Sequence, residues 1–297
     1  MNQPVDAPKM EGRVIAAHGR QYMVQLPDGS VLPCFPRGKK SDVACGDRVD
    51  IQRTSNDQGV IEAIQPRTSL LYRSNEIKQK LIAANVDQLV IVVATEPGFS
   101  DELVTRALVA AESEEIEILI ILNKCDLTDK LPAARERLAI FAGLGYRVLE
   151  LSALEHAEDL RPALHGKTSV LVGQSGMGKS TLVNALFPEA QAATREISSA
   201  LDSGKHTTTH ATLYNLDGDS QLIDSPGLQE FGLGHLDRQE IEQSFREFRP
   251  FLGQCRFRDC QHNREPDCAL SAALKAGVID ARRFAIYHRI VGSQRPE

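Results

Sequence analysis

The sequence predicts a chain of three parts: a small antiparallel β barrel, an α/β domain with a mostly parallel sheet, and a short, mostly helical module. Three observations lead to this expectation. Short apolar runs alternate with turn residues over residues 11–72, buried strands alternate with helices from about residue 78, and three of the six cysteines lie within Cys255–Cys268. We place the domains at 1–72, 73–235 and 236–297. A length of 297 residues is enough for about two average domains of ~100–200 residues.

The composition is that of an ordinary globular protein. Hydrophobic residues make up 42% and charged residues 25% of the chain, which excludes wholesale disorder and fibrous repeats. The longest apolar runs, Leu89–Ala94 and Ile116–Leu122, are far shorter than the ~18 residues of a membrane span, and the first residues lack the apolar segment of a signal peptide. We therefore expect a cytoplasmic protein with no membrane partner.

The net charge of −6 argues against a general nucleic-acid binder, but its distribution changes that interpretation. Residues 73–235 hold 14 Lys and Arg against 23 Asp and Glu, whereas residues 1–72 hold 9 against 8 and residues 236–297 hold 11 against 9. The acidity thus lies in the middle of the chain. Both flanks are mildly basic and are candidates for contact with nucleic acid.

The first domain contains five short apolar segments, each followed by turn residues. We expect strands at residues 12–18, 21–27, 30–36, 45–52 and 59–65. A spacing of about 8–12 residues without a helical period is typical of a small antiparallel barrel, and an OB fold is the first choice. An all-β packing domain without a ligand stays open as the alternative. Pro66 and the residues after it are expected to lead into a linker.

The second domain alternates strands with helices. Val86–Ala94 is an almost continuous apolar run, as expected of a parallel strand that is buried on both faces. Further strands are expected at residues 116–123, 146–153, 169–173, 211–216 and 220–224, and helices at 100–112, 130–142 and after the glycine-rich turn through Phe187. Ser100 is the expected N-cap of the first helix. Alternation of this kind predicts a parallel-rich sheet with helices on both faces.

A phosphate-binding loop is the strongest motif of the chain. The pattern G-x-x-x-x-G-K-[ST] follows an expected strand and opens a helix, which is the context that the motif requires. Its residues are Gly173, Gln174, Ser175, Gly176, Met177, Gly178, Lys179 and Ser180, with Thr181 next to them. The glycines let backbone N–H groups point at phosphate oxygens, Lys179 can reach the β- and γ-phosphates, and Ser180 can ligate Mg²⁺.

Three further segments fit a guanine-nucleotide site. In the N-K-x-D sequence at Asn123, Lys124 and Asp126, the Asp126 carboxylate can accept hydrogen bonds from N1 and N2 of guanine, a donor pair that adenine lacks. Asn123 can reach guanine N7 and the phosphate loop, and the Lys124 stem can cover the base.

Ser152-Ala153 follows the next strand and offers a backbone N–H for guanine O6. The last of the three segments is the D-x-P-G sequence, in which Asp224 can hold Mg²⁺ through water and the Gly227 N–H can sense the γ-phosphate.

The order of these motifs is unusual. In the common G domain the phosphate loop comes first and the guanine box last, whereas here the guanine box and Ser152-Ala153 precede the phosphate loop and D-x-P-G comes at the end. The same sheet results if the original termini are joined and new ones are opened elsewhere. The sequence therefore predicts a circularly permuted GTPase domain.

With this motif order, the chain resembles the YjeQ/EngC family of circularly permuted GTPases, the small ribosomal subunit biogenesis (RsgA) type. The match spans essentially the whole chain. The family combines an OB fold, a permuted G domain and a C-terminal zinc module. The resemblance implies late maturation of the 30S ribosomal subunit, with the subunit and its 16S rRNA as partners. It also implies weak hydrolysis of GTP to GDP and phosphate that the 30S subunit stimulates, and we expect this hydrolysis to time release. A monomer is the default expectation.

The family pattern also assigns roles in the polar segment between Pro188 and Thr212. It gives Mg²⁺ coordination in the GTP state to Thr208 and positioning of the attacking water to His206, so that the catalytic candidates are His206, Lys179 and Thr208. His206 can equally be a surface histidine or an RNA contact, and His210 is expected to be structural. Leu228 follows Gly227 where many GTPases have a catalytic Gln, and Gln229 is not assumed to point inward.

A metal centre is predicted near the C-terminus. Cys255, Cys260, His262 and Cys268 supply three thiolates and one imidazole, a closed tetrahedral set suited to one structural Zn²⁺ ion, and the family carries the same pattern. No neighbouring carboxylate of obvious use is apparent in the sequence. Short helices are expected at Ala269–Ala276 and Ala281–Val291.

Two groups of residues are candidates for contact with rRNA. The arginines of the C-terminal module are Arg282, Arg283, Arg289 and Arg295. The basic and aromatic residues of the barrel are Tyr22, Phe35, Arg37, Lys39 and Lys40.

Two alternatives stay open. The chain can be a slow guanine-nucleotide-sensing rRNA-binding module with little turnover, which Leu228 favours. An ATP-using P-loop enzyme is the other alternative, and Asp126 argues against it.

Overall fold

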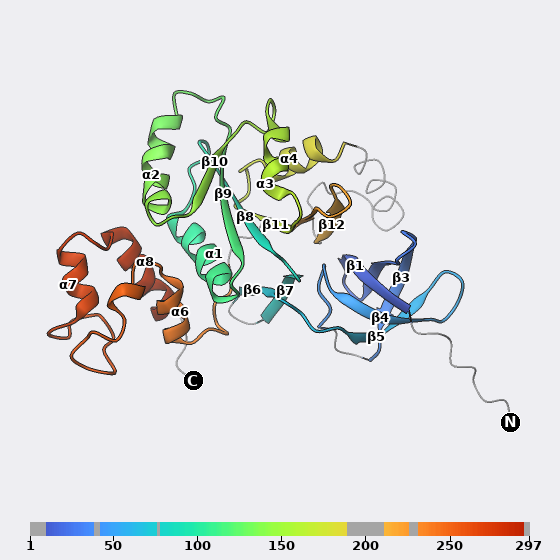
Figure 1. The fold of residues 1–297 in the computed structure, drawn as a ribbon, viewed down its shortest axis with the longest axis horizontal. Coiled ribbons are helices and arrows are strands. Elements are labelled where there is room, and N and C mark those ends of the chain that lie inside the picture. The colour runs from blue at the N-terminus through green and yellow to red at the C-terminus, as the bar shows by residue number, and fades with distance from the viewer. Residues whose placement is uncertain (1–9, 39–41, 76–77, 189–210, 226–230, 294–297) are drawn as a thin grey trace.

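A computed structural model of the chain describes residues 10–38, 42–75, 78–188, 211–225 and 231–293. These residues form a barrel, a central α/β domain and a helical module, in that order along the chain (Figure 1). No helix within the described ranges is long and apolar enough to cross a membrane.

The N-terminal part is a closed barrel. Its strands are β1 (Met10–His18), β2 (Gln21–Gln25), β3 (Val31–Pro36), β4 (Arg48–Arg53) and β5 (Gly59–Ile64). They pair in the order β1-β2-β3-β5-β4, and β4 pairs again with β1 to close the ring. β3 and β5 are parallel and the other neighbours antiparallel, which is the arrangement of an OB-fold barrel and confirms that expectation.

The inner face of the barrel follows the two-residue period of its strands. Tyr22, Val24 and Leu26 point inward together, and the exposed fraction of Tyr22 is 3%. The expectation that Tyr22 contacts RNA is therefore wrong, because its ring is part of the core. A half-buried arginine also pairs with a buried carboxylate here: the Arg67 guanidinium lies 2.7 Å from the carboxylate of Asp47, whose exposed fraction is 0%.

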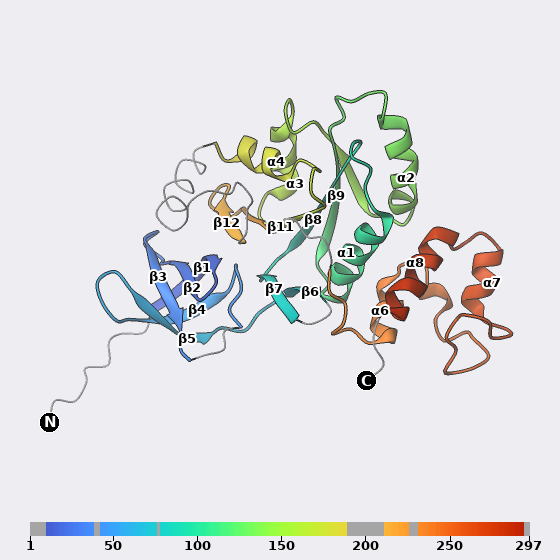
Figure 2. The ribbon, with the colours of Figure 1, turned by 180° about the vertical axis from the view of Figure 1, so that it is seen from behind.

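A two-stranded ribbon follows the barrel, where a linker was expected. β6 (Leu70–Asn75) and β7 (Lys78–Ala84) pair with each other and not with the main sheet. The N–H of Ala84 donates to the carbonyl of Cys45 in the barrel, and the N–H of Leu70 donates to Glu114 beside the first long helix. The ribbon thus bridges the barrel and the α/β domain, as Figure 2 shows from behind.

The central sheet confirms the predicted α/β fold. Its strands are β8 (Gln88–Ala94), β9 (Glu117–Asn123), β10 (Arg147–Glu150), β11 (Thr168–Val172), β12 (Thr212–Asn215) and β13 (Gln221–Asp224). The order is β10-β9-β8-β11-β13-β12, with all neighbours parallel except β12 and β13. The chain order reverses between β8 and β11, and ligands of such sheets bind at the carboxyl ends of the strands next to this point.

Helices connect the strands of this sheet. They are α1 (Asp101–Ser113), α2 (Leu131–Gly143), the 3-10 helix η1 (Ala157–Leu160), α3 (Arg161–Leu164) and α4 (Lys179–Leu186). The Ser100 hydroxyl accepts a hydrogen bond from the N–H of Leu103 at 3.3 Å, so Ser100 is the N-cap of α1 as predicted.

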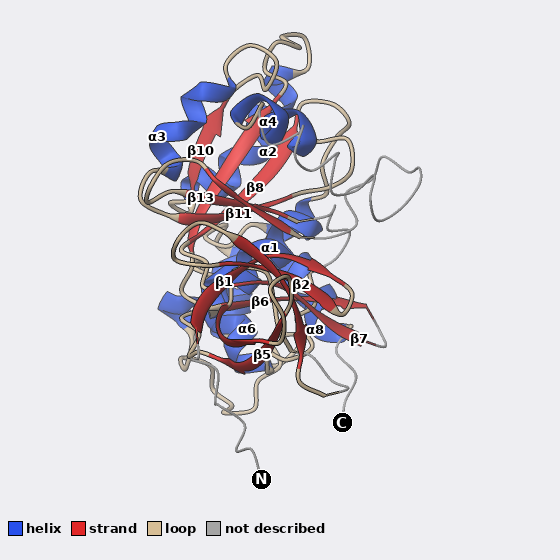
Figure 3. Cartoon of the chain, turned by 90° about the vertical axis from the view of Figure 1, so that its right-hand side faces the viewer, coloured by secondary structure: helices blue, strands red, loops and turns tan. Residues whose placement is uncertain are grey.

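Within the described residues, one cross-strand pair and several side chains join the barrel to the central sheet. Ala16 of β1 is the cross-strand partner of Thr212 in β12, and Thr212 is in turn the partner of Asp224 in β13. The guanidinium of Arg13 donates to the Thr168 hydroxyl at 3.0 Å and to the side chain of Gln221, across the same junction. In Figure 3 the barrel strands accordingly lie directly below the strands of the central sheet.

The C-terminal module is helical and packs on α1. It contains α6 (Arg238–Ser244), the 3-10 helix η2 (Arg249–Phe251), α7 (Ala269–Lys275) and α8 (Ala281–Gly292). Its core includes the aromatic rings of Phe245, Phe248 and Tyr287.

Arg283 of α8 joins this module to α1 from the inside. It has an exposed fraction of 2%, lies 2.7 Å from the carboxylate of Glu247, and donates to the Thr105 hydroxyl of α1 at 2.9 Å. The expectation that Arg283 contacts RNA is therefore wrong, because this side chain is enclosed by the module and α1.

Candidate functional site

The phosphate loop, Gly173–Ser180, leaves the carboxyl end of β11 and enters α4. Gly173, Gly176 and Gly178 have φ angles of 149°, 83° and 91°. A Cβ on Gly173 would lie 2.3 Å from the Val92 carbonyl oxygen, and one on Gly178 would lie 2.2 Å from Nδ2 of Asn123. Both the backbone conformation and the close packing therefore require glycine at these two positions.

Asn123 connects three of the predicted motifs. It ends β9 with an exposed fraction of 1%, and its side-chain amide donates to the carbonyl of Met177 in the phosphate loop at 2.8 Å. Its side-chain oxygen accepts from the N–H of Ala153 at 2.9 Å. The guanine box, the phosphate loop and Ser152-Ala153 are thus held together by one buried side chain.

Further predicted residues lie near Asn123 at the carboxyl ends of the strands. Lys124 has a φ of 62°, and its ammonium group donates to the Glu96 carbonyl at 2.7 Å. Asp126 is exposed, as is Ser180 at the start of α4, and Thr181 is half-buried. The hydroxyl of buried Ser152 has no hydrogen-bond partner among the described residues.

The segment after β8 was not predicted to belong to the site. The N–H of Ser100 donates to the side chain of Gln174 in the phosphate loop at 2.7 Å, and the ring of Pro97 lies 3.3 Å from the position of a Cβ on Gly176. The Thr95 hydroxyl donates to the carbonyl of Lys124 at 3.0 Å. β8 ends at the same sheet edge as β9 and β11, and this adjacency was the signal that could have identified it.

Lys179 and Asp224 are both buried, and the charge of each affects the pKa of the other. The Lys179 ammonium donates to the carbonyls of Gly173 and Gln174 at 2.5 and 2.9 Å. Burial lowers the pKa of Lys179, and Asp224 opposes this shift. Burial raises the pKa of Asp224 to about 6, and Lys179 opposes that shift in turn. A buried carboxylate at a phosphate site fits a divalent cation, because a cation would replace the lost hydration.

Several predicted residues lie outside the described part of the chain. These are His206, Thr208, His210, Gly227, Leu228 and Gln229, together with Lys39, Lys40 and Arg295.

The predicted metal ligands come together in the C-terminal module. The ligand atoms of Cys255, Cys260, His262 and Cys268 lie within 4.8 Å of one another. His262 Nδ1 is 3.5 Å from the Cys255 sulfur and 3.4 Å from the Cys268 sulfur. Four such atoms converging on one point fit a tetrahedral site for a structural metal ion.

Two of these cysteine sulfurs accept hydrogen bonds from backbone N–H groups. The N–H groups of Ala269 and Ser271, in the first turn of α7, donate to the sulfurs of Cys255 and Cys268 at 3.4 Å each. Burial raises the pKa of Cys268, but the hydrogen bonds of its sulfur with Ser271, His262 and Cys260 together outweigh burial and lower the pKa to about 6. Thiolates are the form that binds a metal ion.

The Glu242 carboxylate lies beside His262 on the side of the ring that faces away from the thiols. Glu242 Oε1 lies 3.4 Å from Nε2 of His262, and it also accepts hydrogen bonds from the Tyr287 hydroxyl at 2.6 Å and from Arg238 at 2.9 Å. It therefore turns the opposite ring nitrogen of His262 toward the thiols. This carboxylate was not predicted, because Glu242 precedes the first ligand by thirteen residues and reaches the centre through the packing of α6.

The remaining RNA candidates are exposed, but most have an acidic partner. Arg37 pairs with Glu62, Arg289 lies 2.8 Å from Glu102, and Arg282 lies 3.9 Å from Asp101. Phe35 on the outside of the barrel has an exposed fraction of 37%.

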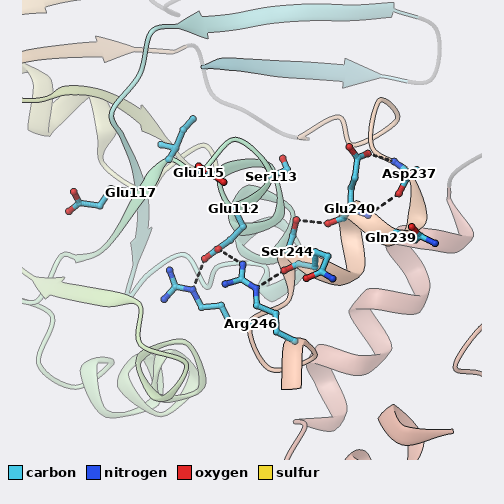
Figure 4. A pocket seen from close by; sticks show the side chains of 12 residues that line it. Glu112, Ser113, Glu115, Glu117, Asp237, Gln239, Glu240, Ser244 and Arg246 are labelled. Carbon is cyan, nitrogen blue, oxygen red and sulfur yellow. Dashed lines mark hydrogen bonds and ion pairs between the residues drawn. The ribbon is translucent and has the colours of Figure 1, made fainter. Parts of the chain in front are cut away.

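A separate open pocket of about 840 Å³ lies between α1, the start of β9 and α6 (Figure 4). Its lining includes Glu112, whose carboxylate lies 2.6 Å from Arg246 and 2.7 Å from Arg249. Asp237 and Glu240 form the capping box of α6. None of the predicted nucleotide or metal residues lines this pocket, and the ion pairs of Glu112 fasten the C-terminal module to α1.

Comparison with known proteins gave concordant results. The sequence model of the RsgA GTPase family matches residues 64–234. A small ribosomal subunit biogenesis GTPase RsgA of Burkholderia pseudomallei (strain K96243) is 57% identical over 288 residues, 95% of this chain and 92% of that protein. The protein of the same name from Nitrosospira multiformis is 50% identical over 289 residues, 97% of this chain and 92% of that protein.

Two solved structures are similar over nearly the whole chain. YjeQ from Thermotoga maritima has a TM-score of 0.73 and 30% sequence identity, covering 97% of this chain and 100% of that one. YloQ, described as a circularly permuted GTPase, has a TM-score of 0.70 and 26% identity, covering 100% of both chains.

Proposed function

Because the chain belongs to the RsgA GTPase family, we propose that it hydrolyses GTP during late maturation of the 30S subunit and that hydrolysis times its release. The curated relatives carry the name small ribosomal subunit biogenesis GTPase. The proposal of guanine-nucleotide binding rests on the position of Asn123, whose side chain bonds the guanine box to the phosphate loop and to Ser152-Ala153. The 30S subunit and its 16S rRNA are the proposed partners.

In this proposal the base is selected by the loops at the carboxyl end of the sheet. Asp126 accepts hydrogen bonds from N1 and N2 of guanine, and its exposure leaves the carboxylate available to a base. The Lys124 stem covers the base plane, and the Ala153 N–H, which donates to Asn123 in this structure, turns to guanine O6 when the base is bound. Adenine leaves the Asp126 carboxylate unpaired, so GTP is preferred over ATP.

The phosphates are held by residues Gly173–Thr181. Backbone N–H groups of the loop bind the phosphate oxygens, and Lys179 exchanges its bonds to the Gly173 and Gln174 carbonyls for the β- and γ-phosphates. Ser180, Thr208 and Asp224 would hold Mg²⁺. The ion, when bound with GTP, neutralises charge that develops on the phosphates.

Hydrolysis requires a residue that orients water. We assign this role to His206 on the family pattern; Leu228, where many GTPases have a catalytic Gln, has no polar group for it. The Gly227 N–H senses the γ-phosphate, and the segment with Thr208 orders when GTP is bound and relaxes after hydrolysis. The C-terminal metal ion is Zn²⁺ and is structural, because three thiolates and one imidazole leave no open coordination position.

A second candidate function follows from Leu228. A chain without a catalytic Gln can act as a slow sensor of guanine nucleotides that binds rRNA and scarcely turns over. The two candidates differ in how the 30S subunit affects hydrolysis.

The test is GTP turnover by the zinc-replete protein with and without isolated 30S subunits, with 50S subunits as the control. Strong stimulation by 30S subunits that collapses in His206→Ala supports the proposed function. Equal turnover with either subunit contradicts it and favours the sensor.

Two further measurements test the remaining parts of the proposal. In Asp126→Asn, preference for xanthosine triphosphate over GTP would establish the base assignment, and unchanged preference would refute it. Equal affinity of the GTP and GDP forms for 30S subunits would refute the role of hydrolysis in release.

A further inference from the structure

The cationic side chains of the C-terminal module are mostly committed to ion pairs. Those with a carboxylate partner within 4.0 Å are Arg238, Arg246, Arg249, Arg256, Arg282, Arg283 and Arg289. Among the described residues of this module, Arg258, Arg264 and Lys275 have no such partner. Two of these three lie between the metal ligands, so the free positive charge of the module is concentrated at the metal centre and not on α8.

An exposed aromatic ring lies in the same place. Phe257 has an exposed fraction of 41%, and it stands between Arg256 and Arg258 in the segment bracketed by Cys255 and Cys260. The Arg256 guanidinium lies 5.4 Å from the centre of the Phe257 ring. A single exposed ring is ordinary on a protein surface, but here a planar cation lies beside it and a second arginine, Arg258, follows it in the chain.

The acidic groups nearby are largely engaged by the loop itself. The Glu265 carboxylate accepts hydrogen bonds from the N–H groups of Gln261 and Asn263 at 2.8 Å each, and from the N–H of Arg264 at 3.0 Å. Asp267 lies 3.1 Å from Arg256 and holds this guanidinium beside the ring. Asp259 is the remaining exposed carboxylate of the segment.

The conformation of the segment between Cys255 and Cys260 is already fixed in the unbound protein. Its two ends are metal ligands, the Cys260 N–H donates to the Phe257 carbonyl at 3.3 Å, and the Arg256 N–H donates to the Asp267 carbonyl at 3.3 Å. A ring that is already positioned loses little conformational entropy when it binds.

We propose that Arg256, Phe257, Arg258 and Arg264, here called the metal-loop patch, bind unpaired bases of single-stranded RNA. Phe257 stacks on a base, and Arg258 and Arg264 contact the flanking phosphates. Duplex RNA is recognised mainly through phosphates and shape, for which two free cations are few, whereas an exposed ring beside a guanidinium group suits a base that is not stacked in a helix. The proposal rests on the proposed function and specifies the class of RNA that the C-terminal module contacts.

The test is binding of the full-length, metal-loaded protein to a fluorescent, unstructured RNA oligonucleotide, compared with a duplex of the same sequence. Phe257→Ala is expected to weaken binding to the single strand roughly tenfold, and Phe257→Trp to restore it. Val278→Ala is the matched control, because Val278 is an apolar residue of the same module with an exposed fraction of 61%. Arg258→Gln should make the affinity less dependent on salt.

Three outcomes would overturn the proposal. These are unchanged binding in Phe257→Ala with normal metal content, an equal loss in Val278→Ala, and weaker binding of 30S subunits by Phe257→Ala while oligonucleotide binding is unchanged. The last outcome would mean that the ring meets a ribosomal protein. Failure of the 30S subunit to stimulate the wild-type GTPase would refute the proposed function separately, since the oligonucleotide titration does not depend on turnover.

Discussion

Replacing Gly178 by alanine should disable the nucleotide site through one side chain, Asn123. Gly178 has a φ of 91°, and the left-handed region costs an alanine about 1–2 kcal/mol. The new Cβ would lie 2.2 Å from Asn123 Nδ2, so the amide must move by about 1 Å to reach an ordinary contact. Movement breaks its bond to Met177 and leaves a buried polar group unpaired, which costs about 1–3 kcal/mol more.

The control is Gly166→Ala in the same domain. Gly166 has a φ of 69°, and a Cβ added there would meet nothing within 4 Å, so this position bears the backbone strain without the collision. Titration with a fluorescent GDP, together with the thermal midpoint, separates the two effects. We expect Gly178→Ala to lose at least tenfold in affinity, and Gly166→Ala to lose only stability.

Wild-type affinity in Gly178→Ala would refute the reasoning, because it would show that Asn123 can leave the phosphate loop without consequence. An equal loss of affinity in Gly166→Ala would also refute it, since the loss would then come from strain alone.

Three other experiments test the charged groups. Burial raises the pKa of Asp224 to about 6, so this carboxylate holds a proton below that pH in the metal-free site. The Mg²⁺ affinity, measured by titration calorimetry, should therefore fall as the pH decreases through 6, by up to about tenfold per pH unit. A Mg²⁺ affinity that does not change with pH would contradict this. Glu242→Ala should weaken metal retention about 10–100-fold in a chelator competition, because His262 loses its orienting partner; retention equal to wild type would argue against that role. Arg283→Met should destabilise the protein by about 3–5 kcal/mol in denaturant unfolding, because Glu247 is left buried without a partner, and the double variant with Glu247→Leu should recover much of the loss. If the double variant recovers nothing, lost packing and not lost charge is the cause.

The sequence predicted those features whose determinants lie close together along the chain. The phosphate loop is contiguous and sits between a strand and a helix, and the strand periods of the barrel and the central sheet are local patterns. The four metal ligands span only Cys255–Cys268, so their spacing in the sequence was enough to predict that they form one cluster.

The errors concern contacts between distant segments. Arg283 was expected at the surface because its neighbours are charged, but its partners Glu247 and Thr105 are supplied by other elements. Glu242 reaches His262 only after α6 packs against the metal loops. Tyr22 differs, since its alternation with Val24 was visible in the sequence and indicated the core face.

The attachment of the barrel to the central sheet has a mechanical consequence. Only the pair of Ala16 and Thr212 joins the two backbones in register within the described ranges, with the side chain of Arg13 across the seam. Each such hydrogen bond contributes about 1 kcal/mol net, whereas the barrel and the sheet each close on a full hydrophobic core. Barrel residues also reach the core of the central domain, because buried Cys45 belongs to that core, Ile15 packs against it, and the Cys45 carbonyl accepts a hydrogen bond from the Ala84 N–H. Because Thr212 is the cross-strand partner of both Ala16 and Asp224, a displacement of the barrel is transmitted to Asp224, at the phosphate end of the sheet, across two strand pairings.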